Sequence, residues 1–84
     1  MASKRARNRF VDLFRLNLRR LMAARGLTIR SLAPMMDTSH VHVSRILMGH
    51  QKPTLTWMGK AADALGVEMQ EFFEPISQEP VDAR

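Results

Sequence analysis

The chain has 84 residues, which is enough for one small domain. It contains no cysteine, so disulfide bonds and thiolate metal sites are excluded, and its stability must come from an apolar core, alone or extended by a partner subunit. No apolar run approaches the roughly 20 residues that span a bilayer, and no signal-peptide core is present. We therefore expect a cytoplasmic protein with no membrane partner.

The net charge of +5 conceals an uneven distribution. Residues 1–60 contain 12 Lys/Arg and 2 Asp/Glu (+10), whereas residues 61–84 contain 1 and 6 (−5). A basic body with an acidic end favours a polyanionic partner that contacts only the first part of the chain. A solubilising surface is the alternative explanation of the same charge.

The first part of the chain predicts an arm followed by a long helix. Residues 1–8 are basic and have no apolar periodicity, which predicts a flexible arm. From 9 to 25 apolar residues recur at helical spacing, so this segment is predicted to be a helix that Asn8 or Ser3 can cap. Gly26 then supplies the left-handed residue that ends many helices. The residues of the apolar stripe are Phe10, Leu13, Phe14, Leu18, Leu21 and Met22.

Two short helices follow, over 29–36 and 40–48. Thr28 and Ser39 stand at their starts as candidate caps, and Gly49 closes the second one. Pro34 lies inside the first of the two, where it removes a hydrogen bond, so we expect this helix to be kinked or shortened.

The remaining sequence predicts two more helices and a tail. Thr54 can cap a helix over 55–65, with Leu55, Met58, Ala62 and Leu65 facing inward and Trp57 off that stripe. Gly66 ends it, and a fifth helix over 68–74 stops before Pro75. Residues 76–84 are predicted to be a disordered acidic tail. The expected fold class is therefore all-α, with five short helices in one domain over 9–75.

The helix over 40–48 separates into two faces at about 100° per residue. Val43, Ile46 and Leu47 fall on one side, which must pack inward, and His42 lies at the margin. The other side carries His40, Val41, Ser44 and Arg45, short hydrogen-bonding groups and one cation that can read base edges in a major groove. Two short helices joined by a tight turn form a helix-turn-helix unit, whose second helix enters that groove.

The chain resembles the phage-repressor and Cro-like (XRE-type) helix-turn-helix family from about residue 14 to 74. The resemblance implies a compact five-helix lambda-repressor-like fold, sequence-specific binding of duplex DNA, and usually a two-fold dimer. It also implies a small plasmid- or phage-encoded repressor in the bacterial cytoplasm, associated with the nucleoid when bound. Ile29, Asp37 and Leu47 depart from residues common in the family, a glutamine, a turn glycine and an acidic residue. The matching pieces are Gly26-Leu27-Thr28, Leu32-Ala33, Val43-Ser44-Arg45-Ile46, Gly49, Pro53-Thr54-Leu55 and Ala64-Leu65-Gly66-Val67.

Site residues follow from the outward side and from the family resemblance. His40, Val41, Ser44 and Arg45 are the predicted base-reading residues, with Val41 a candidate for a thymine methyl and Arg45 for a guanine. The resemblance implies phosphate contacts from helix starts and from the loop after the third helix. Those residues are Thr28, Arg30, Lys52 and Thr54. His42, at the margin of its helix, is predicted to be a further phosphate ligand or simply exposed. Lys4, Arg5, Arg7 and Arg9 are predicted to bring the arm into a groove or against phosphates, with a solubilising tail as the alternative.

Val67, Phe72 and Phe73 add more apolar surface than a small core easily hides, so they are the predicted homodimer interface. The leading hypothesis is a repressor that binds a palindromic operator as a dimer. An antitoxin-like protein-interaction module with incidental DNA binding is the alternative, and a membrane-surface helix over 9–25 is a third.

No enzymatic chemistry is predicted, because paired carboxylates, a nucleophile–base set and a phosphate loop are missing from the sequence. His40, His42 and His50 do not form a metal site by their spacing. We therefore expect no cofactor, no metal and no small-molecule effector.

Overall fold

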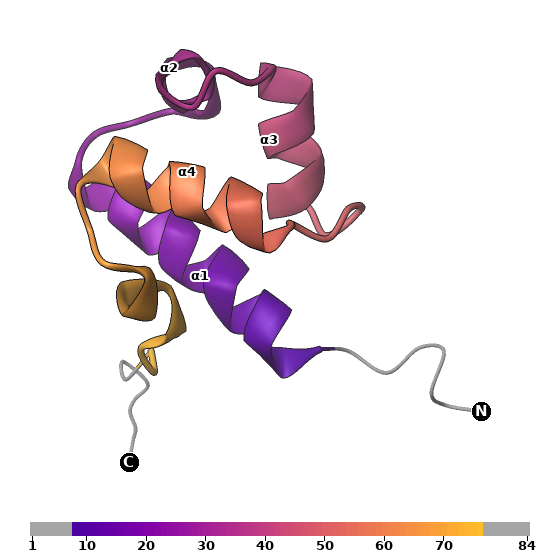
Figure 1. Cartoon of the computed structure of the whole chain (residues 1–84), viewed down its shortest axis with the longest axis vertical. Helices are drawn as coiled ribbons and strands as arrows, with labels where there is room; N and C mark the ends of the chain where they lie inside the picture. Colours follow the sequence, from indigo (N-terminus) through magenta and orange to yellow (C-terminus); the bar gives the residue numbers. More distant parts are fainter. Residues whose placement is uncertain (1–7, 77–84) are drawn as a thin grey trace.

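The computed structural model describes residues 8–76, so the predicted arm and tail lie, apart from Asn8 and Ile76, outside the described residues. The helices of this range are α1 (Arg9–Ala24), α2 (Ile29–Met35), α3 (His40–Leu47), α4 (Leu55–Leu65) and a short 3-10 helix, η2 (Met69–Phe73). No strand occurs between residues 8 and 76, and the all-α prediction is confirmed. In Figure 1, α2 and α3 form one end of the molecule, and η2 lies at the other end against α1.

Each α-helix begins at a polar residue whose side chain satisfies a free backbone N–H of the first turn. The Asn8 side chain accepts hydrogen bonds from two N–H groups at 2.9 and 3.2 Å. The hydroxyl oxygens of Thr28, Ser39 and Thr54 each accept one, from the N–H three residues on, at 3.1, 3.1 and 3.0 Å. These four predicted helix starts are confirmed.

The helix ends differ from the prediction by one residue in three cases. Arg25, Met36 and Met48 are C-cap residues rather than the last residues of α1, α2 and α3. Pro34 lies within α2, which has only seven residues, while the start of this helix is secured by the reciprocal bonds of a capping box.

The turn between α2 and α3 depends on one residue with a left-handed backbone. Asp37 has a φ of 56° and is the only non-glycine residue with positive φ in the described part of the chain. Because short polar side chains tolerate this conformation, Asp37 can stand where a turn glycine is usual. The tight turn brings α3 against α2.

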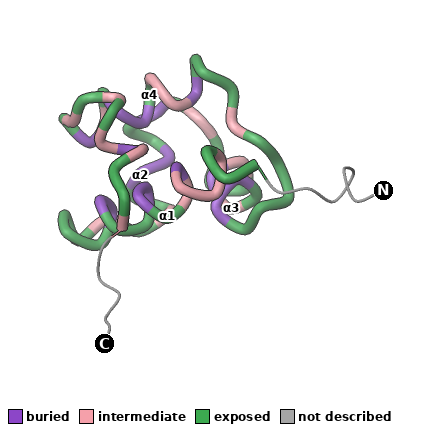
Figure 2. Tube along the Cα trace, turned by 90° about the horizontal axis from the view of Figure 1, so that it is seen from below, coloured by how far each residue is buried: buried purple, intermediate pink, exposed green. Residues whose placement is uncertain are grey.

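The core forms where the four α-helices and η2 meet, and Figure 2 shows buried positions recurring along every helix. Helix α3 contributes Val43, Ile46 and Leu47, which are 0%, 0% and 2% exposed. The predicted inward side of this helix is therefore confirmed. The most deeply buried large side chains of the whole core are Phe14, Phe72, Leu18, Leu32, Ile46 and Val43.

Two predictions for α4 were wrong. Leu55 was expected inside but is 71% exposed, because it is the first residue of the helix and lies beyond the edge of the core. Trp57 was expected off the inner side of the helix, but it is only 6% exposed. Its ring packs edge-on to Phe14, with centroids 6.2 Å apart, so it belongs to the core.

The fifth helix is a 3-10 helix rather than an α-helix. Only five residues separate Glu68 from Glu74, both of which are extended, and this length allows little more than one 3-10 turn. Phe72 is 0% exposed and its ring lies 4.6 Å from that of Phe14. The assignment of Phe72 to a dimer interface was therefore wrong, because this side chain is buried in the core of its own protomer.

Asn17 is a buried polar residue that the sequence analysis missed. Its Nδ2 donates hydrogen bonds to the carbonyl oxygens of Phe72 and Glu74, at 2.8 and 2.9 Å. Its Oδ1 accepts two from the Arg20 guanidinium, at 3.1 and 2.9 Å. The side chain thus ties η2 to the middle of α1. An asparagine between Phe14 and Leu18 on the apolar side of a helix was the available signal.

Candidate nucleic-acid interface

Helix α3 presents a free outward side to solvent. His40, Val41 and Arg45 are exposed and Ser44 is half-buried, as the two-faced pattern predicted. Met48, the C-cap residue, continues the same side and is 61% exposed, more than the 47% of Val41. Met48 had no role among the predicted contacts. We call these five residues, His40, Val41, Ser44, Arg45 and Met48, the outward face of α3.

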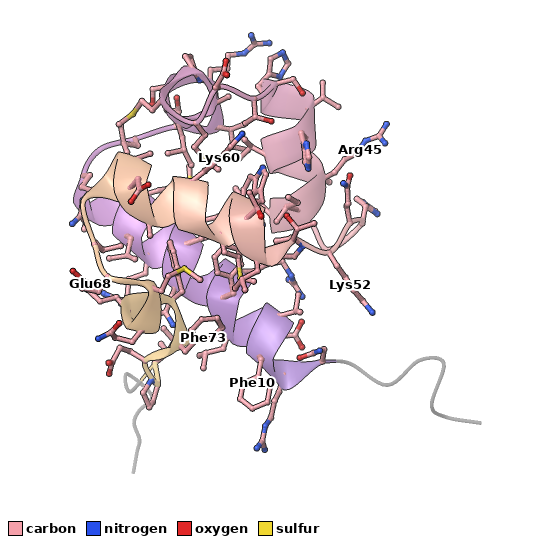
Figure 3. All side chains as sticks on the ribbon, in the orientation of Figure 1. Phe10, Arg45, Lys52, Lys60, Glu68 and Phe73 are labelled. Carbon is pink, nitrogen blue, oxygen red and sulfur yellow. The ribbon has the colours of Figure 1, made fainter. Side chains whose placement is uncertain are left out.

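Arg45 is available for an intermolecular contact. Its guanidinium has no hydrogen-bond or ion-pair partner within residues 8–76. Figure 3 shows Arg45 and Lys52 projecting from the same side of the molecule, away from Glu68 and Phe73 at the other end. A fork of donors on a fixed helix suits the O6 and N7 acceptors of guanine, or a phosphate.

His42 differs from the other predicted contact residues because its side chain is already engaged. Its ring is half-buried and stacks on Trp57, with centroids 5.8 Å apart and planes 25° apart. Its Nε2 lies 3.2 Å from Nε2 of Gln51 in the loop after α3. These contacts connect α3, its following loop and α4, so His42 also supports the loop that carries Lys52.

The other predicted phosphate-contacting residues surround the outward face of α3. Arg30 and Lys52 are exposed, and their side chains have no partner in the described part of the chain. Thr28 and Thr54 are exposed but use their hydroxyl oxygens as helix caps. The N-termini of α2 and α4 still carry free backbone N–H groups, which are suited to anionic oxygens.

Arg19 of α1 holds the C-terminal end of α3, and Arg15 lies beside the following Gly49; neither contact was predicted from the sequence. Arg19 donates a hydrogen bond from Nη2 to the Leu47 carbonyl oxygen at 2.7 Å. Arg15, which pairs with Asp12, places its guanidinium carbon 3.6 Å from where a Cβ on Gly49 would lie. Gly49 has a φ of 84°, so a side chain there would also be strained. Only the spacing of arginines on α1 hinted at such anchors.

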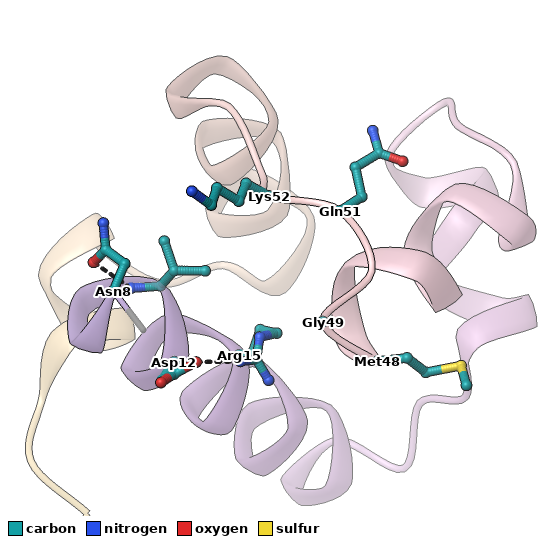
Figure 4. A pocket seen from close by; sticks show the side chains of 8 residues that line it. Asn8, Asp12, Arg15, Met48, Gly49, Gln51 and Lys52 are labelled. Atoms are coloured by element: carbon teal, nitrogen blue, oxygen red, sulfur yellow. Dashed lines mark hydrogen bonds and ion pairs between the residues drawn. The ribbon is translucent and has the colours of Figure 1, made fainter. Parts of the chain in front are cut away.

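A polar cleft of about 380 Å³ opens beside this anchor. Figure 4 shows it between the start of α1 and the loop after α3, with Asp12 and Arg15 on one wall and Gln51 and Lys52 on the other. Asn8, Val11, Met48 and Gly49 complete its lining. The cleft thus lies directly next to the outward face of α3.

Of the predicted arm residues, only Arg9 is among the described residues. It is exposed, and its guanidinium carbon lies 5.2 Å from the centre of the Phe10 ring, within cation–π range. Lys4, Arg5 and Arg7 lie outside the described residues.

Val67 and Phe73, the remaining residues predicted for a dimer interface, are half-buried and pack on the core. Val67 lies just before η2 and Phe73 is its last residue, and Figure 3 shows Phe73 pointing away from the side on which Lys52 projects. An interface there would leave the outward face of α3 free.

Within the described residues, no three His, Asp or Glu side chains lie together as a metal site would require. None of the helices in that range is long and apolar enough to cross a membrane.

The fold, with α3 presented by a tight turn from α2, is that of a helix-turn-helix DNA-binding regulator. A family model described as helix-turn-helix matches residues 18–72, and the chain belongs to this family in its XRE-type, Cro-like form.

A crystal structure of the restriction-modification controller protein C.AhdI from Aeromonas hydrophila is similar to this chain. The two share 30% sequence identity with a TM-score of 0.70, over 75% of this chain and 96% of that one. No curated protein sequence matches the chain.

Proposed function

We propose that this regulator is a transcriptional repressor that binds a palindromic operator as a homodimer, with α3 in the major groove. The observation that carries the proposal is the outward face of α3. It joins hydrogen-bonding groups to an unpaired Arg45, on a helix whose other side is completely buried. His40, Val41, Ser44 and Arg45 contact bases in this proposal.

Phosphate contacts come from the surroundings of that face. Arg30 and Lys52 supply unpaired cations, while Thr28 and Thr54 bring helix N-termini to the backbone. His42 adds a contact only from its exposed edge, since its ring is stacked on Trp57. Arm residues Lys4, Arg5, Arg7 and Arg9 add further positive charge.

A dimer formed through Val67 and Phe73 would pair two outward faces. In such a dimer the two α3 helices would enter half-sites one helical turn, roughly 34 Å, apart. Occupancy of such a site blocks RNA polymerase. The similarity to a restriction-modification controller protein supports a regulatory role in a bacterial cytoplasm.

The test begins with selection of duplexes from a random pool, followed by a footprint on the DNA flanking the chain's own gene. Arg45→Ala should weaken binding to the selected duplex about 10-fold or more and relax the preference at one base pair, with little change on random DNA. Lys60→Ala, which removes an exposed cation of α4, is the matched control for net charge. Equal losses of affinity for the selected and the random duplex would show that Arg45 contacts only phosphate.

Repression has its own readout. Transcription in vitro from the footprinted promoter should fall as the wild-type protein is added. The Arg45→Ala variant at the same concentration should lower it much less. Failure to select any sequence would favour the protein-interaction module instead. A rise in transcript would identify an activator.

A further inference from the structure

Met48 is more exposed than Val41 on the outward face of α3, and neither the predicted nor the proposed DNA contacts include it. At 61% exposure it leaves a large apolar side chain in water next to Arg45. Its backbone is still helical, with φ −86° and ψ −3°, and its N–H donates to the Ser44 carbonyl oxygen at 2.9 Å. The direction of its side chain therefore follows the helical repeat of α3.

That repeat places Met48 at the centre of the outward face. At about 100° per residue, Met48 projects only about 20° from Val41 and about 60° from Arg45. His40 projects about 100° from Val41, nearer to the buried side. Met48 therefore projects closer to the middle of the outward face than His40 does, at the C-terminal end of α3.

The thioether is also held in this position. The Ser44 hydroxyl donates a hydrogen bond to the Met48 sulfur at 3.4 Å, across one turn of the helix. Ser44 thus orients Met48, which reduces the freedom that a long methionine side chain loses on binding.

We propose that Met48 is a specificity residue and that, together with Val41, it selects thymine methyl groups on both sides of the base pair read by Arg45. An apolar side chain in a major groove has one apolar base feature to contact, the C5 methyl group of thymine. Val41 and Met48 are seven residues apart, about 10 Å along the helix axis, or about three base-pair steps. This inference rests on the proposed placement of α3 in the major groove.

The test replaces single thymines by uracil in the half-site selected by the wild-type chain, which removes only the C5 methyl group. One uracil position should weaken wild-type binding about three- to five-fold, the effect of one methyl group leaving an apolar contact. The same replacement should have no effect on Met48→Ala. A second position, about three base pairs away, should lose its effect in Val41→Ala instead.

Met35→Ala is the matched control, because Met35 is 51% exposed but lies at the end of α2, beside Lys60 and Asp63. It should keep both uracil effects. The proposal for Met48 is contradicted if no uracil position weakens wild-type binding, or if every uracil replacement weakens binding by Met48→Ala as much as it weakens wild-type binding. Failure to select any half-site would instead contradict the proposed function itself.

Discussion

Arg19 shows how one exposed side chain of α1 controls the helix proposed to read DNA. A helix ends with carbonyl oxygens that lack intrahelical partners. Arg19 donates a hydrogen bond to the one at Leu47, at 2.7 Å, and its positive charge lies next to the negative end of the α3 dipole, which stabilises it. The last turn of α3, which carries Met48, is therefore held by a residue 28 positions earlier in the chain.

Arg19→Gln should lower the free energy of unfolding by about 1 kcal/mol, the net value of one such hydrogen bond. Urea denaturation followed by circular dichroism measures this change. Arg30→Gln is the matched control, because Arg30 is an exposed arginine whose side chain has no partner in residues 8–76. Equal free energies of unfolding for the two variants would show that Arg19 does not anchor α3.

At the scale of elements, η2 depends on α1 more than on its own hydrogen bonds. A 3-10 helix of five residues has little intrinsic stability. It is held by burial of Phe72 and by the two bonds that Asn17 donates to the Phe72 and Glu74 carbonyl oxygens. One polar side chain inside the core thus determines where the C-terminal part of the described chain lies.

Asn17→Asp should destabilise the protein by about 1–3 kcal/mol, because it keeps the shape and the acceptor for Arg20 but removes both donors, leaving buried carbonyl oxygens unsatisfied. Thermal unfolding measures the loss, and amide hydrogen exchange should show faster exchange in η2 than in α3. Asn17→Ala should share this pattern. Wild-type protection of η2 in both variants would show that Phe72 alone holds the element.

At the scale of the whole molecule, charge is segregated. Arg45 and Lys52 project on one side, whereas η2, at the other end, contains Glu71 and is flanked by Glu68 and Glu74. This distribution orients the protein so that its basic side approaches a polyanion first. The proposed dimer surface at Val67 and Phe73 therefore lies near the acidic end.

Phe73→Glu should weaken dimerisation at least about 10-fold, because a carboxylate would be desolvated in an apolar contact. Sedimentation equilibrium measures the dissociation constant. Leu55→Glu is the control, since this 71% exposed residue begins α4 and belongs to no proposed subunit contact.

Phe73 also touches the core, so circular dichroism must show that the variant is folded, and Val67→Glu provides a second test. If both variants sediment as the wild type does, the proposed dimer interface is wrong.

Local sequence rules sufficed where neighbouring residues decide the outcome. Four caps, the left-handed Asp37 turn and the two sides of α3 follow from hydrogen-bonding side chains and from helical periodicity. The family resemblance, which the helix-turn-helix match confirms, followed from the order and spacing of short motifs. The predicted contact residues themselves remain predictions.

Periodicity failed where packing between distant elements decides the outcome. It counted Leu55 as core because it repeats with Ala62, and it excluded Trp57, although a large ring can reach the core from the margin of a helix. It predicted Phe72 to be exposed apolar surface, because the neighbouring residues in the sequence do not show that this ring packs against Phe14 of α1.

The sequence by itself determined the class of fold, the position of each α-helix and which side of α3 faces solvent, since these depend on interactions within about one helical turn. Only the tertiary structure decided that Arg19 holds the end of α3, that Asn17 and Phe14 hold η2, and that Met48 remains exposed after the helices have packed. The first two are contacts between segments far apart in the chain. The third depends on which side of a helix end remains uncovered once those segments have packed.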